Sequence, residues 1–150
     1  MDTVFKKMNF KDQTEICVLQ SPESFGPNLE VMQAFTAVKT DLKEVQKLQF
    51  GLAFVTKQSE VDAFSVAFAE KLEGDGQIWF AYPKGSSKRY KCEFNRDNGW
   101  AVLGKLGFEP VRMVAIDEDW SALRFRRVEF VKNMTRSFAL TEEGKAKTGK

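Results

Sequence analysis

The chain has 150 residues and a mass of 17.1 kDa, the size of one domain, and 43% of its residues are apolar, as in globular proteins. It has no histidine and only two cysteines, Cys17 and Cys92, which excludes histidine-based catalysis, histidine metal sites and structural zinc. The net charge of +2 is too small to indicate nucleic-acid binding. No apolar run is long enough for a signal sequence or a membrane span, so we expect a reduced, cytoplasmic protein that contacts no membrane and holds no metal.

The first half of the chain alternates between strand and helix patterns. Its clearest strand is the mostly apolar run Leu48–Val55, and its clearest helix starts at Ser59 with a capping-box pattern and stops at Gly74 and Gly76. Pro27 suits the first turn of another helix, because that turn leaves its N–H groups unpaired. In chain order we predict strand 14–19, helix 27–33, strand 34–39, a short polar helix 41–47 capped by Thr40 or Asp41, strand 48–55, helix 59–72 and strand 77–82.

The second half begins with a polar segment, 83–98, which is long for a connection inside a compact domain and therefore typical of functional or mobile loops. Two later strands are joined by a link too short for a parallel crossover, which predicts an antiparallel hairpin. Gly107 suits a left-handed helix stop. The elements predicted here are helix 99–106, strands 111–116 and 123–128, helix 129–138 and a disordered basic tail over 141–150.

Strands that alternate with helices predict an α/β fold, because parallel strands need helical crossovers that cover both faces of the sheet. We therefore expect one three-layer α/β/α domain over 1–140, with a mostly parallel sheet of five or six strands and a C-terminal antiparallel hairpin. A mixed α+β sandwich is the alternative. The chain contains no internal repeat and no linker.

A cluster of cations and hydroxyls directly follows the strand 77–82 and is the strongest candidate for a binding site. The carboxyl edge of a parallel sheet is where open α/β folds usually bind ligands. A glycine there allows successive N–H groups to face one anion, and lysine and arginine add charge-assisted hydrogen bonds. A solvated basic loop is an equally good interpretation. The anion-binding candidates are Lys84, Gly85, Ser86, Ser87, Lys88 and Arg89, with Arg96 and Arg124 as further clamps.

A second cluster lies at the predicted hairpin and consists of Asp117, Asp119, Trp120 and Ser121. Either aspartate has the chemistry of a base or a metal ligand, but one turn offers too few fixed ligands for magnesium. We favour structural pairing with the arginines of the returning strand, of which Arg124 and Arg126 share one face.

The two cysteines have different surroundings in the sequence. Cys17 lies in an apolar run and is expected to be buried. Cys92 has basic neighbours that favour a thiolate, but the chain offers no histidine to activate it, so we favour an inert thiol.

Three further segments run from Ile78 to Lys88, from Arg96 to Trp100 and from Val114 to Phe125. They contain a Trp-x-x-Tyr-Pro-Lys element and an Ile-Asp-x-x-Trp-Ser-x-x-Arg-Phe element. With these elements the chain resembles an uncharacterised bacterial domain family of unknown function. The resemblance covers about residues 14–136. It implies a small bacterial cytoplasmic α/β domain and brings no activity, substrate or cofactor.

The function favoured by these observations is a binding domain for an anionic small molecule, bearing phosphate or carboxylate, held by the loop 84–91. One alternative is a histidine-free enzyme that uses Lys84 or Asp117 as acid or base, which requires a buried lysine with a depressed pKa. Another is an interaction module for nucleic acid or protein, and the acidic first half argues against nucleic acid. The sequence leaves the ligand, the cofactor and the oligomeric state open.

Overall fold

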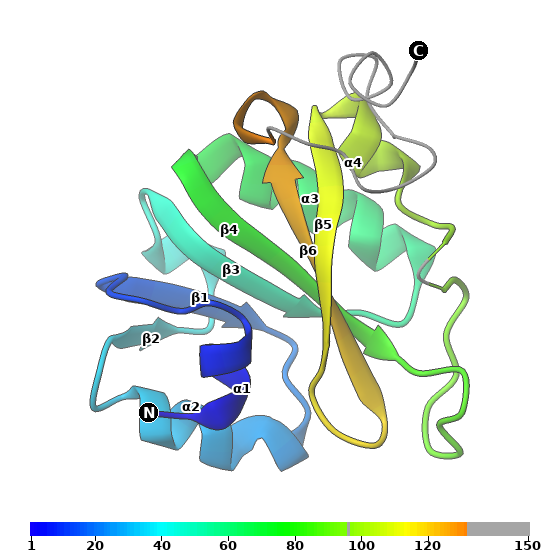
Figure 1. The fold of residues 1–150 in the computed structure, drawn as a ribbon, viewed down its shortest axis with the longest axis horizontal. Coiled ribbons are helices and arrows are strands. Elements are labelled where there is room, and N and C mark those ends of the chain that lie inside the picture. The colour runs from blue at the N-terminus through cyan, green and yellow to red at the C-terminus, as the bar shows by residue number, and fades with distance from the viewer. Residues whose placement is uncertain (96, 132–150) are drawn as a thin grey trace.

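The computed structural model describes residues 1–95 and 97–131, which form a six-stranded sheet with helices on both faces (Figure 1). The strand order is β2-β1-β3-β4-β6-β5. Neighbours from β2 to β4 run parallel, and β6 pairs antiparallel with both β4 and β5. The strands are β1 Glu15–Leu19, β2 Ala37–Lys39, β3 Leu48–Phe54, β4 Leu72–Pro83, β5 Phe108–Ala115 and β6 Trp120–Arg127.

The helices divide between the two faces of the sheet and make the three predicted layers. In Figure 1, α1 and α2 lie in front of the sheet, and α3 and α4 lie behind it. The α-helices are α1 Thr3–Lys7, α2 Gly26–Met32, α3 Gln58–Lys71 and α4 Ala101–Lys105, and the short 3-10 helices are η1 Glu23–Phe25, η2 Leu42–Glu44 and η3 Val128–Phe130. The predicted mostly parallel α/β sheet with a C-terminal hairpin is confirmed.

Each face of the central strands buries its own core, because successive side chains of a strand point to opposite faces. On the front face, Trp79 of β4 packs in one cluster with Phe5 of α1 and Phe50 of β3. On the back face, Phe80 of β4 packs with Phe68 of α3. The strands of the middle of the sheet are therefore apolar on both sides, which explains why the sequence shows them as continuous apolar runs.

Several predicted boundaries are wrong for local reasons. The polar helix 41–47 is only the 3-10 turn η2, although Asp41 caps it as predicted by accepting from the Lys43 N–H at 2.9 Å. Strand β4 begins at Leu72, directly after α3, so the glycines at 74 and 76 lie inside a strand. The short helix α1 was missed, because its five residues give too little periodicity to detect.

Other predicted boundaries shift by a few residues. Strand 34–39 is reduced to β2, and the hairpin strands begin three residues earlier than predicted, at Phe108 and Trp120. Gly107 has φ +90° and ends α4 as expected. Most of the helix predicted over 129–138, and the tail, lie outside the described residues. None of the helices described in 1–95 and 97–131 is long and apolar enough to cross a bilayer.

Candidate functional site

The structure brings the two clusters predicted from the sequence together. The loop after β4 meets the turn between β5 and β6, where the Lys84 N–H donates to the Asp119 carbonyl at 2.8 Å. The Ser87 hydroxyl donates to the Asp119 carboxylate at 2.9 Å and also accepts from the Tyr90 N–H at 3.1 Å. Ser87 and Asp119 therefore fasten the loop to the hairpin, and these hydrogen bonds occupy the hydroxyl that was expected to bind an anion.

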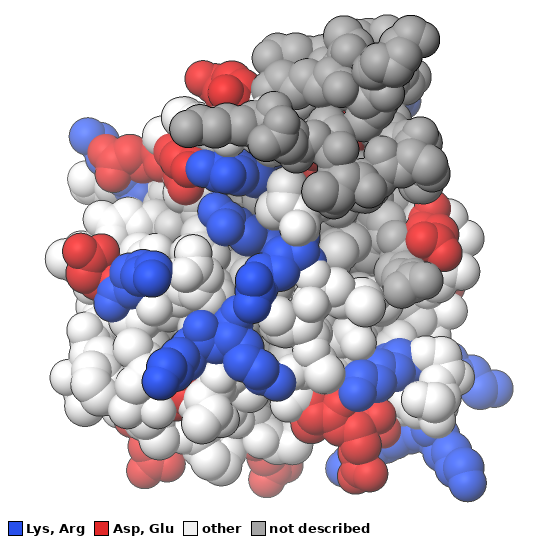
Figure 2. Space-filling model, viewed as in Figure 1, with Lys and Arg blue, Asp and Glu red and all other residues white. Residues whose placement is uncertain are grey.

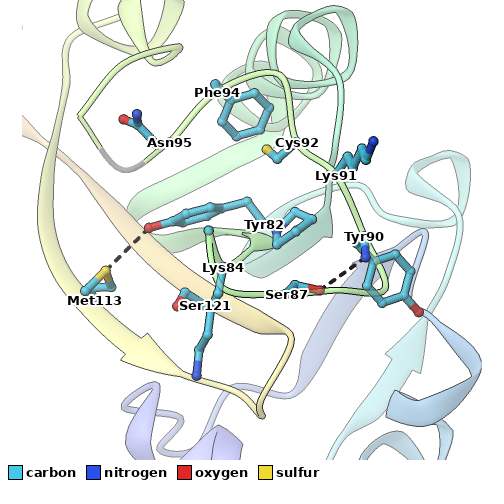
Figure 3. A pocket seen from close by; sticks show the side chains of 12 residues that line it. Tyr82, Lys84, Ser87, Tyr90, Lys91, Cys92, Phe94, Asn95, Met113 and Ser121 are labelled. Atoms are coloured by element: carbon cyan, nitrogen blue, oxygen red, sulfur yellow. Dashed lines mark hydrogen bonds between the residues drawn. The ribbon is translucent and has the colours of Figure 1, made fainter.

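The cations of this loop do not converge on one point. In Figure 3 the side chains of Lys84 and Lys91 leave the cavity in different directions. Lys88 and Arg89 are exposed and do not line the cavity, and the Arg89 guanidinium lies 5.8 Å from the ring centre of Tyr90. Gly85 lines the cavity rim and Ser86 is exposed, whereas Arg96 lies outside the described residues.

The acids of the hairpin turn have structural roles. One Asp117 carboxylate oxygen accepts from the N–H groups of Asp119 and Trp120, at 2.8 and 2.9 Å, and so closes the turn. Trp120 is 4% exposed and packs between Phe54 and Tyr90, with ring centres 5.1 and 4.9 Å away. In the part of the chain described here the turn acids form no ion pair with Arg124 or Arg126, so the predicted acid–arginine network is wrong.

Arginines instead gather on the front face of the hairpin, where none of the described helices covers the sheet. Figure 2 shows basic side chains across the middle of this face. Arg126 forms a bidentate pair with Asp75 of β4, at 2.9 and 2.6 Å. Arg124 lies directly opposite Arg112, and its Nε atom is buried without a hydrogen-bond partner. Burial lowers the pKa of Arg124, and the neighbouring charges of Arg126 and Arg112 lower it further.

We expect Arg124→Met to raise the free energy of unfolding by about 1 kcal/mol, because it removes an unpaired buried donor and a like-charge contact. Arg126→Met provides the matched control and should lower it by about 0.5 kcal/mol, since the side chains of its pair with Asp75 are 33% and 35% exposed. Urea unfolding measures both values. A loss of stability in Arg124→Met would show that the guanidinium of Arg124 has hydrogen-bond partners in the folded protein.

A cavity of about 620 Å³ opens beside this loop, at the carboxyl end of β4 (Figure 3). Its apolar wall consists of Tyr82 from β4, Phe94 from the loop and Met113 from β5, and the Tyr82 hydroxyl donates to the Met113 sulfur at 3.4 Å. Asn95 and Ser121 add polar groups. The twelve lining residues are Tyr82, Pro83, Lys84, Gly85, Ser87, Tyr90, Lys91, Cys92, Phe94, Asn95, Met113 and Ser121.

Aromatic packing holds the apolar wall of the cavity rigid. Trp100 packs against Tyr82 and Phe94, with ring centres 5.6 and 5.0 Å apart, and its indole N–H donates to the Asn95 carbonyl at 2.9 Å. These contacts anchor Phe94 and Asn95, which belong to the segment predicted only as a long polar loop.

The structure disfavours the reactive thiolate form of both cysteines. Burial raises the pKa of Cys17 to about 12 and raises the pKa of Cys92 above its usual range. The basic neighbours of Cys92 in the sequence therefore do not produce a thiolate, and the preferred interpretation of an inert thiol agrees with the structure.

The sequence predicted Lys84, Gly85, Ser87 and Ser121 near this site and missed Tyr82, Phe94 and Met113. The sequence does contain a feature that could have indicated two of the missed residues. Tyr82 ends the fourth strand at its carboxyl edge, and Phe94 is the only phenylalanine within the polar segment 83–98. No such feature indicates Met113, because its place beside Tyr82 depends on the pairing of β5 with β6.

The sequence matches no protein-family model and no curated protein. Solved structures do share the fold. A putative type 11 methyltransferase from Sulfolobus solfataricus has a TM-score of 0.56 at 10% identity, covering 89% of this chain and 95% of that one. A SAM-dependent methyltransferase from Aquifex aeolicus has a TM-score of 0.52 at 10% identity, covering 83% and 88%. The fibrillarin pre-rRNA processing protein of Methanococcus jannaschii has a TM-score of 0.51 at 11% identity, covering 78% and 67%.

These matches and the geometry overturn the function favoured from the sequence. Two solved structures that share this fold are named as methyltransferases, and neither is named as an anion-binding protein. The loop 84–91 does not gather its cations around one point, so it is not the anion site that the sequence suggested. The resemblance to a family of unknown function is untested by these comparisons and stays a prediction. At such low identities the matches establish a methyltransferase-like fold.

Proposed function

We propose that the chain binds an uncharged aromatic small molecule in the cavity at the carboxyl end of β4. The observation that carries this proposal is the cavity itself. Its volume of about 620 Å³ lies within the range of about 300–1,000 Å³ that is usual for small-molecule sites. Its position follows the rule that open α/β sheets bind ligands outside the carboxyl ends of their strands.

The chemistry of the lining favours an aromatic ligand without a formal charge. The rings of Tyr82 and Phe94 and the Met113 thioether offer stacking and sulfur–aromatic contacts. The amines of Lys84 and Lys91 point away from the cavity, so neither of these two described lining cations is placed to neutralise a buried anion. Asn95 and Ser121 supply hydrogen-bonding groups that orient one polar edge of a ring.

Substituting Met113 tests the proposal, with indole and adenosine as probes. We expect Met113→Gln to weaken binding of the active probe about tenfold, or ~1.4 kcal/mol, through loss of apolar and sulfur–aromatic contacts. Val111→Gln is the matched control, because Val111 and Met113 lie on the same strand with exposed fractions of 40% and 46% and Val111 does not line the cavity. Isothermal titration calorimetry measures the affinities.

A second readout uses Cys92, which lines the cavity. At alkaline pH, where part of the Cys92 thiol ionises despite its raised pKa, a bound probe should slow its alkylation by iodoacetamide, whereas the buried Cys17 should stay unreactive in every folded sample. Equal weakening by Met113→Gln and Val111→Gln, or no protection of Cys92 by a probe that binds, would place the ligand elsewhere.

A second candidate function is methyl transfer from S-adenosylmethionine, the activity in the name of the Aquifex aeolicus protein. The fold alone favours it, and the residues at the carboxyl ends of β1 and β3, described in the next subsection, argue against it. The same titration with S-adenosylmethionine tests it, followed by a methyl-transfer assay on any compound that binds in the β4 cavity. Lack of binding by S-adenosylmethionine removes this candidate and leaves the first one in place.

A further inference from the structure

The carboxyl ends of β1 and β3 form the switch point of the sheet. The chain leaves β1 towards β2 on one side and leaves β3 towards β4 on the other, so a crevice between the two strand ends is where an open α/β sheet usually takes a nucleotide-type ligand. An adenosyl cofactor, which the methyltransferase-like fold implies, belongs to this class. The residues at this position decide whether such a cofactor fits.

A side-chain bridge joins the two strand ends. Gln20 follows β1, and its amide donates to the Phe54 carbonyl at the end of β3 and to the Glu60 carboxylate of α3, both at 2.9 Å. The other Glu60 oxygen accepts from the N–H groups of Thr56 and Lys57, at 2.9 and 3.1 Å. The N–H groups of Thr56 and Lys57, which directly precede α3, are therefore already paired within the chain.

Hydrogen bonding at this bridge keeps Glu60 ionised. Burial by itself would raise the pKa of Glu60, but the N–H groups of Thr56 and Lys57 and the amide of Gln20 outweigh it, and the pKa lies below its usual value. The hydrogen bonds that Glu60 accepts are therefore charge-assisted throughout the neutral pH range.

Aromatic side chains fill the space in front of the carboxyl ends of β1 and β3. Phe25, in the connection after β1, packs on Phe54 with ring centres 5.0 Å apart, and Phe54 packs on Trp120 at 5.1 Å. Phe25 and Phe54 are each 2% exposed. A ring inserted between β1 and β3 would have to displace these side chains.

The first turn also lacks the residues that let a backbone approach a cofactor. Glycines serve that purpose after the first strand of dinucleotide-binding folds, whereas β1 here is followed by Gln20, Ser21 and Pro22. Asp41 does stand where an acid often binds a ribose, after β2. Its carboxylate caps η2, however, and that one feature does not compensate for the missing glycines.

We infer that the Gln20–Glu60 bridge and the Phe25–Phe54 contact close the switch-point crevice to an adenosyl cofactor, so that the ligand site of this methyltransferase-like fold lies at β4. The placement of the ligand site at β4 rests on the proposed function, whereas the closure of the crevice does not. The protein accordingly binds no S-adenosylmethionine between β1 and β3.

Amide chemical shifts test the closed crevice directly. In ¹⁵N-labelled protein titrated with S-adenosylmethionine, S-adenosylhomocysteine or adenosine, we expect the signals of Gln20, Ser21, Thr56 and Glu60 to stay in place. Shifts of these amides that saturate with the cofactor would overturn the inference. Shifts confined to the amides of Tyr82, Cys92 and Met113 support both the inference and the proposed function, whereas no shift anywhere supports the closed crevice alone.

The bridge itself is tested with Gln20→Gly and its control Asn9→Gly. These are the two non-glycine residues with positive φ in the described part of the chain, at 57° and 63°. Glycine relieves the strained backbone at both positions, but only at Gln20 does it also remove the bridge. We expect the melting temperature to rise by about 2 °C for Asn9→Gly and to fall by about 3 °C for Gln20→Gly. A rise of equal size in both would show that no bridge closes the crevice.

Discussion

We expect Gly99→Ala to lower the free energy of unfolding by about 3 kcal/mol. Gly99 has φ +91°, a conformation that costs an alanine about 1–2 kcal/mol. An added Cβ would also lie 2.6 Å from the Phe94 Cβ and 3.0 Å from the Gln58 Oε1, and such overpacking costs about 1–3 kcal/mol. Because Phe94 forms a wall of the β4 cavity, the same change should also weaken probe binding.

Gly107→Ala is the control for Gly99→Ala. Gly107 has φ +90°, but an added Cβ there meets no atom within 4 Å. Only the backbone cost should therefore appear, about 1 kcal/mol, with probe affinity unchanged. Urea unfolding of both variants separates the two contributions. Equal losses would mean that Phe94 moves aside freely and that the cavity wall is soft.

The second large effect is expected at Trp79, in the middle of β4. Its side chain is fully buried, and its indole N–H donates to the Gln77 amide oxygen at 2.9 Å. The Gln77 amide nitrogen in turn donates to the Asn9 carbonyl at 2.9 Å, which ties the segment after α1 to the sheet. Trp79→Ala should cost about 4 kcal/mol, because it leaves a large cavity and breaks this chain of hydrogen bonds.

Such a loss approaches the total stability of many domains, about 5–15 kcal/mol, so Trp79→Phe provides a milder variant. It should cost about 2 kcal/mol, since it keeps most of the packing and loses the indole donor. Phe35→Ala is the exposed control, because that side chain is 51% exposed, and its effect should stay within about 0.5 kcal/mol. A small effect of Trp79→Phe would show that the hydrogen bond from the indole to Gln77 contributes little.

The sequence alone was enough to predict the class of fold. The run Leu48–Phe54 is apolar at every position except Gln49 because both faces of a parallel sheet are covered, and α3 repeats its apolar residues at helical spacing. The short link between β5 and β6 leaves only an antiparallel hairpin. These signals are local, since each depends on neighbours within one element.

The short elements could not be predicted in the same way. Helix α1 and the turn η2 have five and three residues, too few for a periodic pattern, and tertiary packing stabilises them. Strand β4 starts five residues before the predicted position, because glycines 74 and 76 were interpreted as a helix stop although they lie inside the strand.

The candidate site, too, was predictable from the sequence only where local patterns define it. By itself the sequence determined the sheet, the chemistry of each loop and the carboxyl edge at which β4 ends, because these follow from residue type and periodicity along the chain. Only the tertiary structure decided that the lysines around 84–91 diverge, that Met113 faces Tyr82 and that Gln20 reaches Phe54 and Glu60. Those contacts join residues that are 31 to 40 positions apart, and strand order and register, which no local pattern encodes, bring them together.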